Sequence, residues 1–392
     1  MSGSKSSASP ASSEHKARVD SVRAQIHASL KQQREPEGTA TLGNLLKEAA
    51  DAAEPEPKED PLFLEEGDKV EHSEGYVSLS SLVPTWGRAS EPVSDLMVRV
   101  HDVSEHSESS RVHVPSLDPC YRPPIATLRM LAYAIEKTNA PVFLSGPAGV
   151  GKSSLPRHYC AITGRPFYRF NFNGSMDTSS LLGTTTASAG STTYEEGFLP
   201  EAIRVPNAVI LLDEISLAAP EVLMCLQYLL EPGGKLLLPD KPGSAADKFV
   251  TPAEGVAFLC ADNTRGNGDV TGKYVGTQPQ NLATMDRMGT HLVLDYLFPD
   301  EERDMLQAIF PKATSKLISR MVQVANLTRT AYRQGGVSIP MSARVLQYWV
   351  RHSLNLRNVK QALEISFLNR LDSQSEVQAV LEMMDSVFED VK

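Results

Sequence analysis

The 392-residue chain is poor in cysteine and has no long apolar run. No stretch approaches the roughly 18 consecutive apolar residues of a transmembrane helix, and the N-terminus lacks the apolar core of a signal peptide. The cysteines form no C-x-x-C pair, which is typical of neither a structural zinc site nor a disulfide framework: they are Cys120, Cys160, Cys225 and Cys260. We therefore expect a cytoplasmic protein with reduced thiols and no membrane partner.

Aromatic residues are absent before Phe63, and the chain opens with a serine-rich run over residues 1–13. Residues 1–110 hold 11 of the 38 Lys/Arg and 20 of the 48 Asp/Glu, so nearly all of the net charge of −10 lies there. Such a segment cannot bury enough apolar area to offset its conformational entropy. The composition predicts a disordered tail over residues 1–60, with one short amphipathic helix near residues 19–33.

Basic residues show no excess in the remainder of the chain, where 27 Lys/Arg face 28 Asp/Glu over residues 111–392. A dedicated nucleic-acid binder normally carries such an excess, so nucleic acid is not the expected partner. Residues 61–111 are acidic with scattered apolar side chains such as Leu82 and Trp86. They predict a linker with a docking segment, and a packed domain there is the alternative.

From residue 112 onward, short apolar runs alternate with amphipathic stretches, which is the pattern of an α/β fold with a parallel sheet. A helix is predicted from Ile125 to Ile135, followed by the first of five strands. The predicted strands are residues 142–145, 167–172, 208–212, 256–260 and 291–295. Helical stripes then occupy residues 299–309, 313–333, 342–354, 359–371 and 375–388. We predict an α/β domain over 112–297 and an all-helical lid subdomain over 298–392.

A glycine-rich stretch with the pattern G-x-x-x-x-G-K-[ST] follows the first predicted strand directly. Glycines allow successive N–H groups to face a phosphate, Lys152 supplies a point charge, and the Ser153 hydroxyl suits Mg²⁺. Pro156 is expected to disturb one hydrogen bond of the next helix. The predicted ATP-binding residues are Gly146, Pro147, Ala148, Gly149, Val150, Gly151, Lys152, Ser153 and Ser154.

Polar side chains also follow two later strands. Asp213 is expected to hold the water shell of Mg²⁺ together with Ser153, and Glu214 is expected to polarise the attacking water. Asn263 ends the next strand, where its amide could bond the γ-phosphate or that water. The alternatives are a helix cap for the two acids and simple turn chemistry for Asn263.

These motifs, followed by Met285-Asp286-Arg287 and Ser342-Ala343-Arg344, resemble those of an AAA+ ATPase. The Gly/Thr-rich stretch over residues 263–278 is similar to the CobS-like (cobaltochelatase AAA+ subunit) branch of the MoxR group. The resemblance covers residues from about 112 to 392 and excludes the acidic tail.

The resemblance implies a ring, usually a hexamer, with ATP between neighbouring subunits. It implies that Arg287 is an arginine finger acting on the next subunit and that Arg344 is a second sensor in the lid. A cation delivered in this way would neutralise transition-state charge. For either arginine, a surface ion pair is the alternative.

Two hairpins are predicted from β-branched or apolar segments bounded by turn residues. One pairs residues 183–186 with 192–197, where MoxR relatives carry an insert facing the ring pore, and the other pairs 235–238 with 249–250. Flexible surface loops are the alternative for both.

The sequence as a whole predicts a ring-forming ATPase that hydrolyses ATP with Mg²⁺ to remodel a partner protein. The resemblance implies a von Willebrand A-domain partner (CobT-like), in metal chelation or complex assembly. A DNA-dependent helicase-type motor is one alternative, disfavoured by the balanced charge of residues 235–250. A nucleotide-switched scaffold is another, disfavoured by the complete Asp213 and Glu214 pair.

Overall fold

The computed structural model describes residues 75–83, 96–174, 176–188, 191–266, 268 and 277–388. The predicted disordered tail, its helix near residues 19–33 and Trp86 lie outside the described residues, as does most of the Gly/Thr-rich stretch after Gly266. None of the helices in the described ranges is long and apolar enough to cross a membrane.

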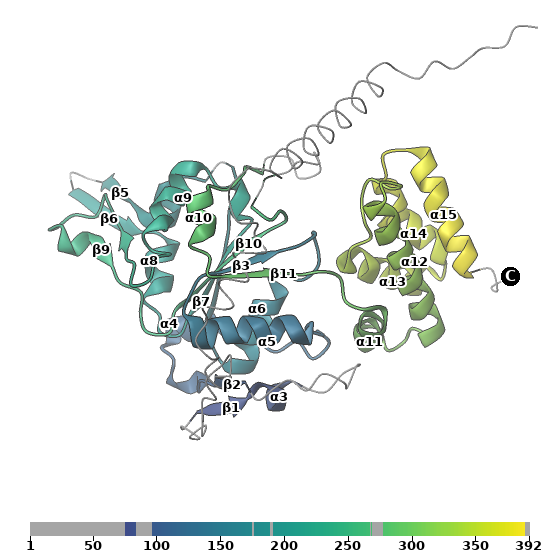
Figure 1. The fold of residues 1–392 in the computed structure, drawn as a ribbon, viewed down its shortest axis with the longest axis horizontal. Helices are drawn as coiled ribbons and strands as arrows, with labels where there is room; N and C mark the ends of the chain where they lie inside the picture. Colours follow the sequence, from purple (N-terminus) through teal and green to yellow (C-terminus); the bar gives the residue numbers. More distant parts are fainter. Residues whose placement is uncertain are drawn as a thin grey trace, which may run out of the picture. The chain divides into compact units, whose positions relative to one another are not determined.

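A five-stranded parallel sheet forms the centre of the α/β domain, as predicted (Figure 1). Its strands, in spatial order, are β11 (Thr290–Val293), β3 (Val142–Ser145), β10 (Ala257–Asp262), β7 (Val209–Asp213) and β4 (Phe167–Asn171). In register, Asp262 pairs with Ser145 and Ala261 pairs with Asp213, so these three strands end together. The phosphate loop and the predicted carboxylates therefore share one edge of the sheet, as expected for a parallel α/β fold.

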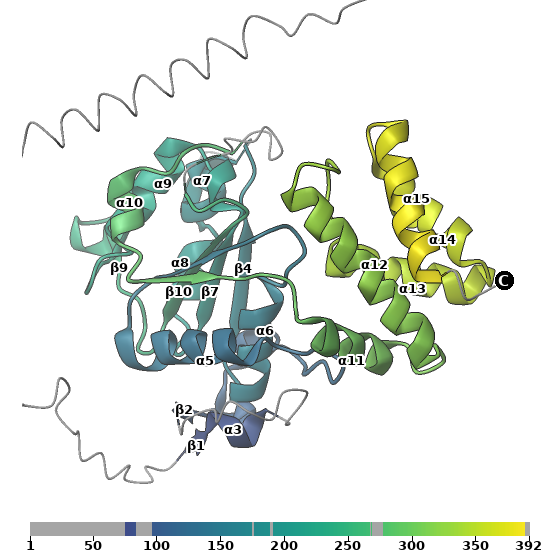
Figure 2. The same ribbon diagram turned by 45° about the vertical axis from the view of Figure 1, so that its right-hand side comes forward.

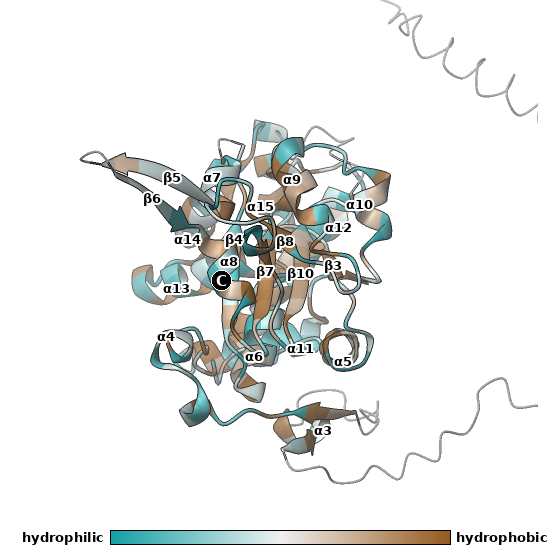
Figure 3. Cartoon of the chain, turned by 90° about the vertical axis from the view of Figure 1, so that its left-hand side faces the viewer, coloured by the Kyte–Doolittle hydropathy of each residue, from teal (hydrophilic) through white to brown (hydrophobic). Residues whose placement is uncertain are grey.

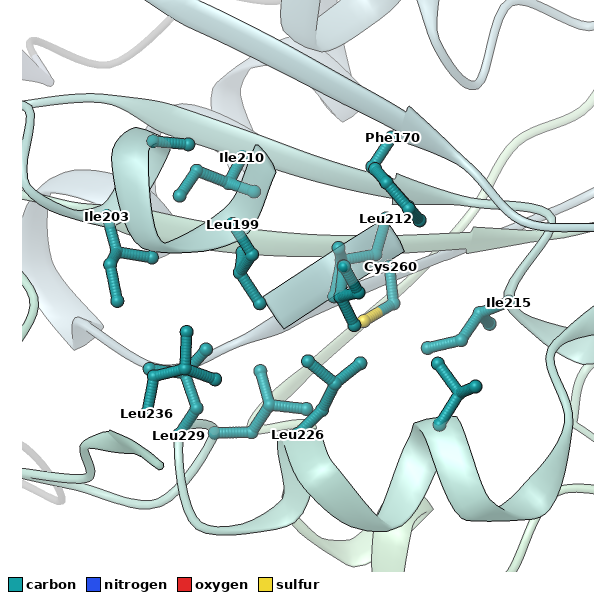
Figure 4. Packing of buried hydrophobic residues seen from close by; sticks show 14 of the residues in the cluster. Phe170, Leu199, Ile203, Ile210, Leu212, Ile215, Leu226, Leu229, Leu236 and Cys260 are labelled. Atoms are coloured by element: carbon teal, nitrogen blue, oxygen red, sulfur yellow. The ribbon is translucent and has the colours of Figure 1, made fainter. Parts of the chain in front are cut away.

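Helices cover both faces of this sheet, which explains why its central strands are continuously apolar. Val209 and Leu211 of β7 pack on one side, and Ile210 and Leu212 pack on the other. The first side is covered by α5 (Ile125–Tyr133), its extension η2 (Ala134–Thr138) and α6 (Ser154–Thr163). The second is covered by α7 (Thr178–Leu182), α8 (Phe198–Ile203) and α9 (Pro220–Gln227). Figure 4 shows Leu199 and Leu226 reaching from this layer toward the strands.

Both predicted hairpins are present. β5 (Gly183–Ser188) pairs with β6 (Ser191–Glu196) over its full length, and Figure 3 shows this ribbon extending away from the sheet. β8 (Leu236–Leu237) pairs with β9 (Phe249–Val250). The remaining elements around them are η3 (Ile215–Leu217), η4 (Ala246–Lys248) and α10 (Leu282–Asp286).

The segment before residue 112 is not a linker where the structure describes it, which corrects the prediction for residues 61–111. Leu79 and Val98 are fully buried in the same core as α5 and α6. The cause is that two short strands, which are separated in the sequence, pair with each other and bring their apolar residues together. The average composition of the segment does not reveal these few apolar residues. The elements are β1 (Tyr76–Ser78), α3 (Leu79–Leu82), β2 (Met97–Arg99), η1 (Val103–Glu105) and α4 (Glu108–Arg111).

Two truncations separate the acidic tail from this packed segment. Removing residues 1–60 is expected to leave the melting temperature unchanged, because an acidic stretch without aromatics adds little to a core. Removing residues 1–111 also deletes Leu79 and Val98 and is expected to lower the melting temperature by at least about 5 °C. Differential scanning calorimetry compares the two, and equal losses would contradict the assignment of the core.

The helical subdomain has a hydrophobic cluster of its own, which includes the fully buried Trp349. Its helices, seen together in Figure 2, are α11 (Pro299–Ile309), α12 (Ser315–Arg333), α13 (Ala343–Leu356), α14 (Val359–Ser366) and α15 (Gln374–Phe388). The all-helical prediction is confirmed, with one difference. The helix predicted over 359–371 ends at Ser366, and η5 (Leu368–Arg370) follows.

Candidate active site

The phosphate loop connects the end of β3 to the start of α6. Gly149 has a φ of 77°, and a Cβ added there would lie 2.8 Å from the Ser342 Cβ, so this position requires glycine. Helix α6 runs unbroken from Ser154, and Pro156 lies in its first turn. The hydrogen bond that Pro156 cannot make falls in this first turn, where the Leu155 N–H still donates to the Gly151 carbonyl oxygen at 2.9 Å, so the helix continues.

A cavity of about 410 Å³ lies over this loop, within the size range of small-molecule sites. It gathers residues from both the α/β domain and the helical subdomain. From the loop and sheet edge they include Lys152, Ser153, Asp213, Glu214 and Asn263, and from the segment after β11 and the helices they include Tyr296, Met305 and Arg344. A molecule bound here would contact both parts of the protein.

Asn263 bridges the phosphate-loop lysine and the second carboxylate. Its Oδ1 accepts a hydrogen bond of 2.7 Å from Lys152 Nζ, and its Nδ2 donates one of 2.8 Å to Glu214 Oε2. Lys152 Nζ also donates to the carbonyl oxygens of Gly146 and Pro147, at 2.8 and 3.1 Å. The lysine ammonium thus lies among oxygen acceptors that an arriving phosphate could replace.

Burial shifts two pKa values in this network toward the uncharged forms. It lowers the pKa of Lys152 and raises the pKa of Glu214, while the attraction between the two groups opposes both shifts. A bound phosphate would favour the charged lysine, because an anion close to an ammonium raises its pKa.

Glu214 has a left-handed backbone conformation, with φ 55° and ψ 42°. Such a conformation is costly for a residue other than glycine and is concentrated at functional sites. It turns the chain sharply after β7, so that Asp213 and Glu214 both line the cavity although they are adjacent. The two acids do not form a helix cap by their side chains, since the cap of η3 has no such bond.

Turn chemistry after β10 is supplied by Asp262 and not by Asn263. The buried Asp262 carboxylate accepts a bond of 2.9 Å from the Thr264 N–H and another from the Ser216 hydroxyl. This leaves the Asn263 amide available for the cavity.

Arg344 lies in the first turn of α13 and lines the same cavity. The chain before it is held by a buried ion pair in which Arg329 donates to both oxygens of Glu302, at 2.7 Å each. Arg329 Nε also donates to the Met341 carbonyl oxygen at 2.8 Å. These contacts fix the entry to α13 and so position Arg344.

Arg287 does not line this cavity, and neither do Gly146 and Pro147 at the start of the phosphate loop. Arg287 follows α10, and its Nε and Nη2 donate to Glu231 Oε1 at 3.1 and 2.6 Å. The ion pair considered from the sequence is therefore present. The Arg287 side chain is a quarter exposed.

Several known proteins are similar to this chain. Residues 141–274 match the AAA domain of the dynein-related subfamily. The aerobic cobaltochelatase subunit CobS of Sinorhizobium sp is 32% identical over 269 residues, which are 66% of this chain and 79% of that protein. The chain belongs to the CobS-like AAA+ ATPases.

Two further similarities are more distant. BssE of Thauera aromatica, which its name describes as a candidate chaperone, is 29% identical over 237 residues, 59% of this chain and 77% of that protein. The solved structure of the RuvB Holliday junction branch migration motor of Thermotoga maritima aligns with a TM-score of 0.42 at 13% identity. It covers 70% of this chain and 80% of the other.

The family resemblance expected from the sequence is thus confirmed, and this CobS-like protein is a nucleotide-binding ATPase. The roles of its individual residues stay predictions. Tyr121 and Arg169 are among the cavity residues that sequence reasoning missed. Tyr121 precedes α5 without any motif, whereas Arg169 interrupts the aromatic strand β4, a signal that could have been noticed.

The residues present suit a magnesium ion. Ser153 and Asp213 both line the cavity of this CobS-like ATPase and offer oxygen atoms, the ligand type that Mg²⁺ prefers. Within the described residues, no group of three or more His, Cys, Asp or Glu side chains could hold a metal. A magnesium ion here would therefore complete its shell with water and phosphate oxygens, as is usual for Mg²⁺.

Proposed function

We propose that this CobS-like ATPase assembles into a hexameric ring and hydrolyses Mg²⁺·ATP between neighbouring subunits to remodel a partner protein. The observation that carries the proposal is the division of the predicted catalytic residues. Lys152, Asp213, Glu214 and Asn263 meet in one cavity, while Arg287 lies outside the cavity of its own chain. A finger acting on a neighbour would have this arrangement.

The chain's own groups have distinct tasks in this mechanism. Lys152 and the loop N–H groups bind the phosphates, and Ser153 with Asp213 would hold Mg²⁺, which supplies charge neutralisation at the phosphates. Glu214 polarises the attacking water, and Asn263 orients the Glu214 carboxylate through their 2.8 Å bond. Arg287 of the next subunit stabilises the charge that develops during transfer.

Remodelling requires that hydrolysis move one part of the protein against another. Arg344 lines the cavity from α13, and Tyr296 and Met305 line it near the start of the helical subdomain. Loss of the γ-phosphate would remove an anionic contact of Arg344 and so change the position of the lid. The name of CobS, a cobaltochelatase subunit, supports metal chelation as the setting, and the name of BssE supports complex assembly.

The partner we propose is a von Willebrand A-domain protein of the CobT type. The test is the ATPase rate and sedimentation of the purified protein with and without such a partner, using Lys152→Ala as the inactive control. We expect ring-sized particles in ATP and a higher rate with the partner. Stimulation by DNA instead would favour the helicase-type motor, and a monomer that never turns over would favour the nucleotide-switched scaffold.

A further inference from the structure

Arg169 of strand β4 forms an ion pair with the carboxylate proposed to hold magnesium. Its Nε donates to Asp213 Oδ2 at 2.8 Å, and its Nη2 lies 2.7 Å from the same oxygen. The other oxygen, Oδ1, accepts the Glu214 N–H at 3.1 Å. Both oxygens of this buried carboxylate are therefore bound by the protein itself.

The sheet explains how Arg169 reaches this position. Strands β4 and β7 are parallel neighbours, and Asn171 is the register partner of Asp213. Side chains alternate along a strand, so Arg169 shares a face with Asn171, while Tyr168 and Phe170 are buried on the opposite face. A long side chain two residues earlier on the same face can extend to the carboxylate.

The two partners differ in their exposure to water. The Asp213 side chain is 5% exposed, whereas the Arg169 side chain is 49% exposed. The buried carboxylate therefore requires a positively charged partner. Dissociation of the guanidinium costs little free energy, because an ion pair with a half-exposed side chain is weak. Arg169 also lines the cavity of about 410 Å³ that contains Ser153.

A guanidinium and a divalent cation that lie against the same carboxylate repel each other, because the two positive charges are close together. We propose that Arg169 competes with Mg²⁺ for Asp213, and so sets the magnesium concentration at which the nucleotide site becomes loaded. In the metal-free subunit, Arg169 neutralises Asp213. Metal entering with the nucleotide displaces the guanidinium into the solvent-exposed part of the cavity. Arg169 is in this sense a positioning residue for Asp213, and the inference rests on the proposed use of Mg²⁺·ATP.

The test measures binding of mant-ATP, a fluorescent ATP analogue, while Mg²⁺ is titrated into the full-length protein. Arg169→Gln removes the competing charge and is expected to lower the midpoint magnesium concentration by roughly fivefold, the range of a modest ion pair. Arg169→Lys keeps the positive charge, but its geometry is less suited to pairing with the Asp213 carboxylate. It is expected to lower the midpoint magnesium concentration by less than Arg169→Gln does. Asp213→Asn, which removes the shared carboxylate, is expected to raise the midpoint.

A second measurement, of the melting temperature, distinguishes loss of competition from misfolding of the variant. In the presence of EDTA the Arg169→Gln protein leaves Asp213 without its partner, so its melting temperature is expected to fall and to be restored by Mg²⁺ more than that of the wild type. An unchanged or higher midpoint in Arg169→Gln would overturn competition, since the arginine would then be neutral toward the metal or assist it. If mant-ATP binding by the wild type did not depend on Mg²⁺, both the proposed use of Mg²⁺ and this inference would be overturned. This outcome differs from a failure of competition alone, because it is seen in the wild type without any variant.

Discussion

Glu214→Gln is expected to bind ATP as tightly as the wild type while its hydrolysis rate falls by roughly 10²–10⁴-fold, the range for loss of a general base. The amide keeps the size of the side chain and can still hydrogen-bond Asn263, which contacts Glu214 at 2.8 Å in the wild type. It cannot accept a proton from the attacking water. Nucleotide binding by equilibrium fluorescence and phosphate release in the steady state measure the two effects separately.

Lys152→Ala is the matched comparison. It removes the ammonium that lies among the loop carbonyls and Asn263, and is expected to lose nucleotide binding itself. Circular dichroism confirms that both variants are folded. An equal loss of nucleotide affinity in the two purified proteins would contradict the division of roles between phosphate binding and water activation.

Arg287→Ala is expected to bind ATP normally and to lose roughly 10³-fold or more in turnover, as for other arginine fingers. The wild-type rate per subunit is expected to rise with protein concentration, because each site is completed by a neighbour. Glu231→Gln removes the carboxylate that holds Arg287 in the single chain, at 2.6 Å, but leaves the arginine present. This control is expected to retain turnover.

Mixing the two inactive variants tests the shared site directly. In a mixed ring, an Arg287→Ala subunit supplies an intact Lys152 and Glu214, and an adjacent Glu214→Gln subunit supplies an intact Arg287. Interfaces of that kind are complete, so part of the activity should return. If Arg287 acted within its own chain, every subunit would keep its own defect. No recovery in rings shown to contain both variants would therefore refute action between subunits.

The sequence by itself determined the features that depend on local chain geometry. The phosphate loop could be predicted because its glycines, lysine and serine act through neighbouring backbone N–H groups. Asp213, Glu214 and Asn263 follow apolar strands, and the strands of a parallel α/β sheet end at one edge, so their meeting was also predictable. Helical periodicity likewise indicated the lid.

Only the tertiary structure decided which distant side chains pair. The Arg169 and Asp213 contact depends on β4 lying beside β7, and Arg287 meets Glu231 across 56 residues of sequence. The packing of Leu79 and Val98 depends on pairing between β1 and β2, in a segment whose average composition predicts a linker. Strand order and register bring such residues together, and neither is encoded in the periodicity or composition of a single segment.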